Sequence, residues 1–196
     1  MFYSICKVIV KAIFNFLFRI KVHGLENVPE TGKCILYSNH ISLLDPLMIA
    51  VILKRRIYFM AKKELFDNKL IGPIIKRWGA FPVKRGKPDI SAIKTALRIL
   101  KEGKIFGIFP EGTRGKERKI KDLEPGIVMI AVKSKAPVIP VVIKNRYKLF
   151  STVNILIGKP RVISTEGDKR LSPQEIKEIG DQMKGALEQL LSKHLS

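Results

Sequence analysis

The sequence predicts an α/β fold in which a mixed, largely parallel central sheet is flanked by helices and preceded by an N-terminal amphipathic membrane-surface helix. One observation supports the sheet and a second supports a single domain. From residue 22 onward, short apolar runs alternate with longer segments of helical periodicity, which is typical of strands joined by crossover helices. The 196 residues suffice for one domain with a sizeable core, and no long linker divides them.

The elements follow in order from this alternation. The apolar runs predict strands over residues 34–38, 57–60, 80–83, 105–109, 138–143 and 153–157. Helical periodicity predicts helices over residues 43–53, 63–76, 89–101, 126–133 and 173–193. The last helix has a clear start, because Ser172 is a suitable N-cap, Pro173 occupies the first position and Glu175 completes a capping box. Ligand sites in open α/β sheets collect beyond the carboxyl ends of strands, where this sequence places its polar clusters.

The first twenty residues are strongly apolar but carry three cations. On a helix of 100° per residue, an arc of about 120° holds the polar side chains, which are Ser4, Lys7, Lys11, Asn15 and Arg19. A membrane-spanning helix would bury the two central lysines at about 2.5–3.5 kcal/mol each. A helix lying in the interface keeps them near lipid phosphates. We therefore expect residues 1–22 to form a membrane-anchoring amphipathic helix and residues 23–196 to form one folded domain. The alternative is a terminal helix packed on the protein's own core.

The net charge points to an anionic partner. Lys and Arg number 37 against 17 Asp and Glu, which leaves +20, and most of the excess lies in residues 1–150. Nucleic acid, a lipid surface or a phosphate-bearing substrate would each suit this charge, as would a basic surface that is simply solvated.

Few residues are available for a disulfide framework or a metal site. The two cysteines, Cys6 and Cys34, are badly spaced for either and fit apolar packing in a reducing compartment. The histidines are His23, His40 and His194. We expect no metal.

The stretch SNHISLLDPL, residues 38–47, follows a predicted strand and places an imidazole and a carboxylate five positions apart. On one helix, His40 and Asp45 would be separated by about 140°. They can meet if His40 lies on the turn before the helix, whose start is either a Ser42–Asp45 capping box or Asp45 as N-cap before Pro46. A carboxylate that accepts the imidazole N–H makes the other nitrogen a better base. A turn histidine beside a plain cap would leave the same pattern.

The stretch GAFPVKRGK, residues 79–87, places Lys84, Arg85 and Lys87 between a strand and a helix. Loops in this position often bind anions, and a guanidinium can hold a phosphate through two hydrogen bonds. A solvated basic loop is an equal alternative.

The stretch FPEGTRG, residues 109–115, follows another apolar strand. Glu111 and Arg114 carry opposite charges, while Gly112 and Thr113 offer backbone N–H groups and a hydroxyl. This mixture suits a substrate that has hydroxyl groups beside a phosphate. The alternative is a β-turn in which the two charged side chains pair with each other.

Together these stretches resemble the 1-acyl-glycerol-3-phosphate acyltransferase family of membrane glycerolipid enzymes. The resemblance covers about residues 23–160, and H-x4-D followed at this distance by FPEGTR makes it specific. Its four motifs occur in order as Asn39-His40…Asp45, Gly79…Arg85, Phe109-Pro110-Glu111-Gly112-Thr113-Arg114 and Val138-Ile139-Pro140.

The resemblance implies a role for the first motif. His40 would be the general base that deprotonates the free hydroxyl of the substrate, with Asp45 holding the imidazole. The oxygen would then attack the acyl thioester directly, without a covalent acyl-enzyme.

It also implies how the acceptor is held. Arg85 and Arg114 would bind the glycerol phosphate and Glu111 would orient the acceptor. Further substrate contacts would come from Asn39, Lys84, Gly112 and Thr113. Backbone N–H groups near residues 39–42 or 112–114 are candidates for the oxyanion stabiliser.

The implied reaction moves a fatty acyl group from acyl-carrier protein or acyl-CoA to the sn-2 hydroxyl of 1-acyl-glycerol 3-phosphate, with no other cofactor. We expect a peripheral, monotopic protein on the cytoplasmic face of the cell membrane, where the N-terminal helix and the basic face contact anionic lipid. Another lysophospholipid or glycerol 3-phosphate is an alternative acceptor.

Two non-catalytic alternatives fit less well. A lipid-surface protein without activity would not require His40 and Asp45 together. A nucleic-acid-binding protein would explain the charge, but it should interleave aromatic residues with Lys and Arg, whereas most of the ten Phe lie in apolar runs. We therefore expect no nucleic acid partner.

Overall fold

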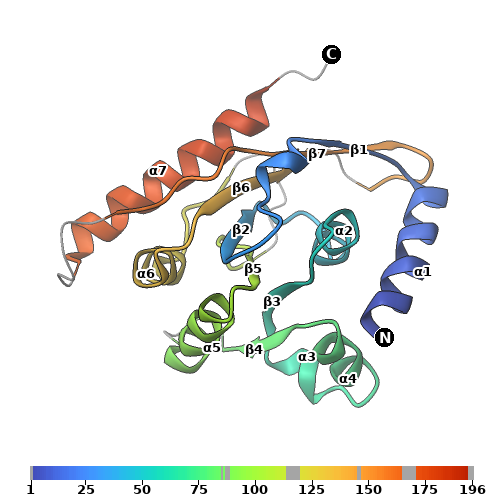
Figure 1. Cartoon of the computed structure of the whole chain (residues 1–196), viewed down its shortest axis with the longest axis horizontal. Helices are drawn as coiled ribbons and strands as arrows, with labels where there is room; N and C mark the ends of the chain where they lie inside the picture. The colour runs from blue at the N-terminus through green and yellow to red at the C-terminus, as the bar shows by residue number, and fades with distance from the viewer. Residues whose placement is uncertain are drawn as a thin grey trace.

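Seven strands form one sheet in a computed structural model that describes residues 2–84, 86, 89–113, 120–144, 147–164 and 171–193. Their order across the sheet is β1-β7-β6-β2-β5-β3-β4 (Figure 1). The strands are β1 (Arg19–His23), β2 (Cys34–Ser38), β3 (Ile57–Lys62), β4 (Phe81–Val83), β5 (Ile105–Ile108), β6 (Val138–Ile143) and β7 (Thr152–Ile157). All neighbours pair in parallel except β6 and β7, which are antiparallel. The predicted mixed, largely parallel sheet is therefore confirmed.

Helices cover both faces of this sheet (Figure 1). They are α1 (Phe2–Leu17), α2 (Asp45–Ile52), α3 (Glu64–Asp67), α4 (Ile71–Arg77), α5 (Ile90–Lys101), α6 (Pro125–Ser134) and α7 (Pro173–Ser192), with a 3-10 turn at Leu25–Asn27. Side chains of α1 and α2 share one core with Cys34 and Leu36 of β2. Side chains of α5, α6 and α7 share the other core with Ile35 and Tyr37. Successive residues of a strand point to opposite faces, so the buried β2 contributes to both cores.

Two predicted elements differ in extent. The helix expected over residues 63–76 is divided into α3 and α4, because the side chain of Asn68 accepts the backbone N–H groups of Leu70 and Ile71 and starts a new helix. The helix expected over residues 1–22 ends at Leu17, and Arg19–His23 forms β1, which pairs with β7. Alternating charged and apolar residues in β1 fit an edge strand as well as the end of an amphipathic helix.

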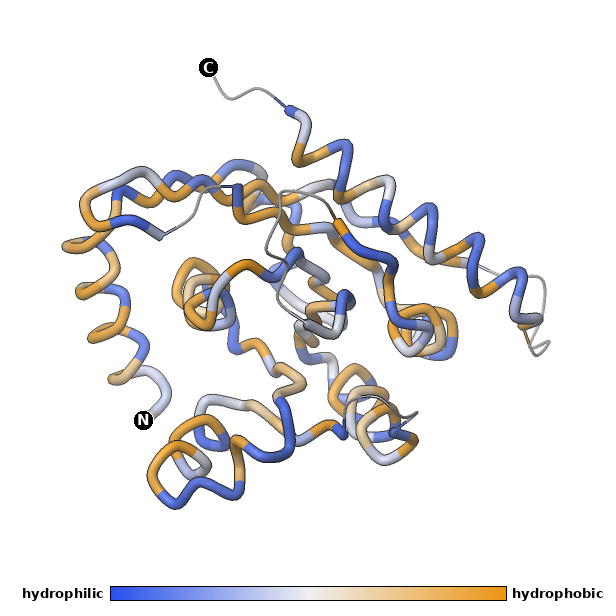
Figure 2. Tube along the Cα trace, turned by 180° about the vertical axis from the view of Figure 1, so that it is seen from behind, coloured by the Kyte–Doolittle hydropathy of each residue, from blue (hydrophilic) through white to orange (hydrophobic). Residues whose placement is uncertain are grey.

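The helix α1 packs against the protein and also exposes apolar residues. Phe14 is buried in the core, and the ammonium group of Lys7 donates a hydrogen bond to the carbonyl oxygen of Leu53. Lys7 thus faces α2 instead of the solvent side that its place in the polar arc suggests. The opposite side of α1, largely hydrophobic in Figure 2, exposes Ile5, Val8, Ile9, Ile13 and Phe16. Within the described part of the chain, no helix is both long and apolar enough to cross a membrane.

Candidate active site

The sheet brings the first and third motifs together. Strands β2 and β5 are parallel neighbours, with Tyr37 of β2 opposite Ile108 of β5. Residues that follow the two strands therefore leave the sheet at the same edge, although about seventy positions separate them in the chain. This adjacency places His40 beside the segment that begins at Phe109.

His40 and Asp45 form a hydrogen-bonded pair. Nδ1 of His40 lies 2.8 Å from Oδ2 of Asp45, whose side chain is fully buried. His40 is on the turn after β2 and Asp45 is the first residue of α2, which is the arrangement that the five-residue spacing requires. Because the carboxylate can only accept, Nδ1 carries the proton and Nε2 presents its lone pair.

The carboxylate of Asp45 has three further donors. Oδ2 also accepts the backbone N–H groups of Ile41 and Ser42, each at 2.7 Å. Oδ1 accepts the hydroxyl of Tyr147 at 2.9 Å. Burial and the negative charge of Asp45 raise the pKa of Tyr147 far above its ordinary value, so the phenol stays protonated and acts as a donor. Nothing in the motifs indicates Tyr147, because a long-range contact outside any local pattern brings it to the site.

The start of α2 agrees only partly with the predicted caps. The backbone N–H of Ser42 bonds to Asp45, as in a capping box, but the hydroxyl of Ser42 accepts the N–H of Leu44 and not that of Asp45. Asp45 lies inside the helix and is not its N-cap. Its carboxylate therefore accepts hydrogen bonds both from the side chain of His40 and from the backbone of the preceding turn.

Glu111 connects the two motifs. Its side chain is buried, and Oε1 accepts the backbone N–H of His40 at 3.2 Å. Oε2 accepts the backbone N–H of Lys121 at 3.3 Å. Each carboxylate oxygen retains a further lone pair that could accept a substrate hydroxyl. The turn that carries the histidine is thus fastened to the loop after β5.

An aromatic stack supports the imidazole. The ring of Phe109 stacks on His40 with centroids 4.2 Å apart, and Phe59 stacks on Phe109 at 5.6 Å. Gly107 makes room for this arrangement, since a Cβ there would lie 2.3 Å from Cε1 of Phe59. A strand glycine, which usually weakens a sheet, here allows a close approach of side chains.

The rest of the third motif turns tightly. Gly112 has φ of 67°, in the left-handed region that favours glycine, and its N–H donates to the carbonyl of Phe109 at 3.2 Å. The hydroxyl of Thr113 lies 3.4 Å from Nζ of Lys121, so this lysine adds a cation to the loop. Lys121 lies beyond the motif, and its sequence context does not single it out.

Asn39, for which we expect a substrate contact, also bonds to the sheet. Its Nδ2 donates to the carbonyl oxygen of Ile143 at 3.0 Å, and its Oδ1 accepts the N–H of Ile143 at 2.9 Å. These two bonds hold the turn after β2 against the end of β6.

The phosphate-binding candidates are described only in part. Arg85 and Arg114 lie outside the described residues. Lys84 follows the carboxyl end of β4, at the same edge of the sheet as the histidine, and its backbone N–H donates to Asp89 at 2.9 Å. The backbone N–H groups of Lys84 and Ala92 hold the pKa of Asp89 below its ordinary value.

Several expected oxyanion donors are already engaged. The backbone N–H groups of His40, Ile41 and Ser42 bond to Glu111 or Asp45. Those of Gly112 and Thr113 bond to backbone carbonyls. In this arrangement none of the five is free to stabilise an oxyanion.

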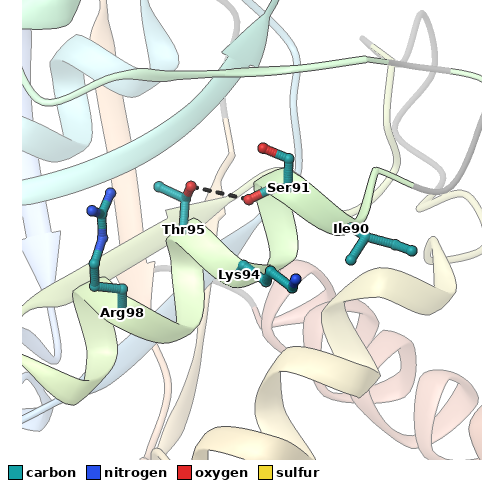
Figure 3. Close-up of a pocket in the computed structure, with 5 residues that line it drawn as sticks. All are labelled: Ile90, Ser91, Lys94, Thr95 and Arg98. Carbon is teal, nitrogen blue, oxygen red and sulfur yellow. Dashed lines mark hydrogen bonds between the residues drawn. The ribbon is translucent and has the colours of Figure 1, made fainter.

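A cavity of about 510 Å³ lies along α5, where its lining residues are Ile90, Ser91, Lys94, Thr95 and Arg98 (Figure 3). Neither His40 nor Asp45 lines it. Across the described ranges, no three His, Cys, Asp or Glu side chains are grouped to hold a metal ion. The chemistry of the hydrogen-bonded pair identifies the candidate site.

Comparisons with known sequences agree with these motifs. A family model described as Acyltransferase matches residues 19–144. A 1-acyl-sn-glycerol-3-phosphate acyltransferase of Bacillus subtilis is 39% identical over 164 residues, covering 81% of this chain and 81% of that protein. A protein of the same name from Streptococcus pneumoniae is 31% identical over 186 residues, covering 93% of this chain and 67% of that one.

A solved structure has a similar fold. The crystal structure of the 1-acyl-sn-glycerophosphate (LPA) acyltransferase PlsC from Thermotoga maritima matches with a TM-score of 0.73 and 28% sequence identity. The match covers 99% of this chain and 81% of that one.

Proposed function

The chain belongs to the acyltransferase family, and from this premise we propose that His40 and Asp45 are its catalytic pair. The activity is the transfer of an acyl group to 1-acyl-glycerol 3-phosphate, which yields phosphatidic acid in phospholipid synthesis. The observation that carries the catalytic assignment is the 2.8 Å hydrogen bond between Nδ1 of His40 and the buried Asp45.

In the proposed mechanism, Nε2 of His40 accepts the proton of the sn-2 hydroxyl while the oxygen attacks the thioester carbonyl. The tetrahedral intermediate then collapses, the C–S bond breaks and the imidazolium returns the proton to the departing thiolate. Asp45 keeps Nδ1 protonated and stabilises the positive charge that forms on the ring. The products are phosphatidic acid and a free thiol.

The acyl group moves directly between the substrates in this proposal, without an acyl-cysteine intermediate. Cys34 is fully buried, and burial raises the pKa of its thiol to about 11, which keeps it protonated at neutral pH. Cys6, the other cysteine of the chain, lies on α1. No metal or other cofactor takes part.

We assign the phosphate of the acceptor to the arginines of the second and third motifs. In the sequence, Arg114 follows Thr113 directly and Arg85 follows Lys84. Thr113 and Lys84 come after β5 and β4, which run parallel in the sheet through β3. Two guanidinium groups can each hold a phosphate through paired hydrogen bonds. Glu111 fastens the histidine turn, and its remaining lone pairs orient the acceptor hydroxyl.

The acyl donor is proposed to be a thioester of acyl-carrier protein or of coenzyme A. The acceptor and the product are lipids, so we also propose that the protein is peripheral on the cytoplasmic face of the membrane. The exposed apolar side of α1 and the charge of +20 support contact with an anionic bilayer.

The test is acyl transfer by the purified full chain with a panel of donors and acceptors. His40→Ala should abolish transfer to lysophosphatidic acid while the far-UV circular dichroism spectrum stays unchanged. His23→Ala, a histidine on β1, is the matched control and should retain activity. Full activity of the His40 variant would rule out the proposed base. Preference for glycerol 3-phosphate would reassign the acceptor.

A further inference from the structure

The short helix α4 and its N-cap residue Leu70 expose three large apolar side chains that neither the sheet nor the active site uses. Leu70 is 80% exposed, Ile71 45% and Ile74 53%. We refer to these three residues as the α4 apolar face. Single apolar residues on a surface need no explanation, but neighbouring ones mark a surface that contacts something.

The α4 apolar face points away from the protein. On the opposite side of the helix, Gly72 is buried so closely that a Cβ would lie 2.5 Å from the carbonyl oxygen of Phe66 on α3. At 100° per residue, Leu70 and Ile74 each lie about 160° from Gly72 around the helix axis. They are therefore not core residues that the fold leaves partly uncovered.

Exposed lysines occur at both ends of α4. Lys69 directly precedes Leu70 in the chain, and Lys76 lies in the last turn of the helix. Exposed Lys63 stands at the start of α3, while the nearby acids are Asp67 and Glu64, the latter 3.6 Å from Lys62 in an ion pair. Outward apolar side chains with lysines near them suit an anionic bilayer. The acyl region accepts the apolar side chains, and the lipid phosphates attract the lysines.

The helix α4 also lies beside the N-terminal end of α1 (Figure 1). Tyr3 of α1 contacts Trp78, which ends α4, with ring centroids 5.7 Å apart. A bilayer that covers α1 can therefore reach α4 without a change in the fold.

We propose that the α4 apolar face is a second contact with an anionic phospholipid bilayer, separate from α1. This inference rests on the proposed membrane association and deepens it. Two contacts at different places fix the tilt of the protein on the membrane, which a single helix leaves free to rotate. The site is then held in one orientation toward its lipid substrate.

Fluorescence quenching locates the contact directly. Trp78 is the only tryptophan of the chain, so Trp78→Phe provides a background in which one indole can be introduced at a chosen position. Leu70→Trp in that background should be quenched by brominated acyl chains in equimolar phosphatidylcholine and phosphatidylglycerol vesicles. Ile90→Trp on α5, at a site 66% exposed, is the matched control and should not be quenched. Absence of quenching at position 70, with vesicle binding intact, would overturn the proposal.

Sedimentation with the same vesicles measures the contribution to binding. Leu70→Ser combined with Ile74→Ser should weaken binding by at least about ten-fold, because two apolar side chains no longer enter the bilayer. Ile90→Ser combined with Val162→Ser removes two exposed apolar side chains elsewhere and should leave binding within about two-fold. Unchanged vesicle binding by the α4 variant would contradict the proposal. If the wild-type protein is a dimer in solution and the α4 variant is a monomer with unchanged vesicle binding, the face would instead contact a second copy of the chain.

Activity in detergent micelles separates this inference from the proposed function. The α4 variant should acylate micellar lysophosphatidic acid at the wild-type rate, because it leaves the active site intact. A wild-type protein inactive in micelles and on vesicles would refute the proposed function, whereas the quenching result would still decide the α4 contact.

Discussion

The hydroxyl of Tyr147 donates a hydrogen bond of 2.9 Å to Oδ1 of Asp45, although 102 positions separate the two residues. This bond leaves Oδ2 for His40 and for the two backbone N–H groups of the turn. The ring of Tyr147 also contacts Phe18, between α1 and β1, with centroids 5.5 Å apart. Tyr147 is therefore a positioning residue that connects the proposed catalytic pair to the N-terminal region.

Tyr147→Phe should reduce kcat by about ten-fold with little change in KM, because the variant loses a hydrogen bond to a charged group but keeps the ring. A variant that loses only stability, with kcat and KM unchanged, would show that Tyr147 acts solely in packing.

Glu111→Gln should lower the free energy of unfolding by about 1–3 kcal/mol, because the amide oxygen replaces two carboxylate oxygens that each accept a backbone N–H group, one of them buried. We expect kcat to fall as well, since the N–H of His40 is one of those groups. Urea denaturation of Glu111→Gln and Glu124→Gln, an N-cap residue without a side-chain cap bond, provides the comparison. Equal stability of the two variants would contradict the tethering role.

Gly107→Ala should destabilise the protein by about 1–3 kcal/mol, because the new methyl group overlaps the ring of Phe59. The cost should shrink in a Phe59→Ala background, and a double-mutant cycle measures that coupling. Gly126→Ala is the matched control, because nothing lies near its Cβ position and alanine favours a helix. Equal stabilities of the two single alanine variants would show that the close approach at residue 107 is unimportant.

Asp89→Ala should cost about 1 kcal/mol at neutral pH, because Asp89 is the N-cap of α5 and accepts the N–H of Ala92. The pKa of Asp89 is lowered in the folded state by the backbone N–H of Lys84 and by that of Ala92. Its stabilising effect is therefore present above the unfolded pKa of about 3.9 and is lost as pH falls through the folded value. Unfolding measured from neutral pH down to that range should show the wild-type advantage narrowing. Asp89→Asn should lose less at neutral pH, since an amide can also cap.

Local patterns were sufficient for most of the fold. The apolar runs at Cys34–Ser38 and Val138–Ile143 became strands with the predicted bounds, and the Ser172 capping box begins α7 as expected. The edge strand β1 escaped prediction, because its short run RIKVH alternates polar and apolar residues and its environment depends on β7, far away in the chain. The break between α3 and α4 depends on a single asparagine side chain within a continuous helical pattern.

For the candidate active site, the sequence alone determined which chemical groups are present, because the five-residue spacing of His40 and Asp45 spans one turn and the start of one helix. Only the tertiary structure decided what surrounds them. Tyr147, Glu111 and Phe109 reach the pair because parallel strands end at a common edge and because the chain returns after β6. Contacts of that kind depend on distances in space, which no local spacing along the chain encodes.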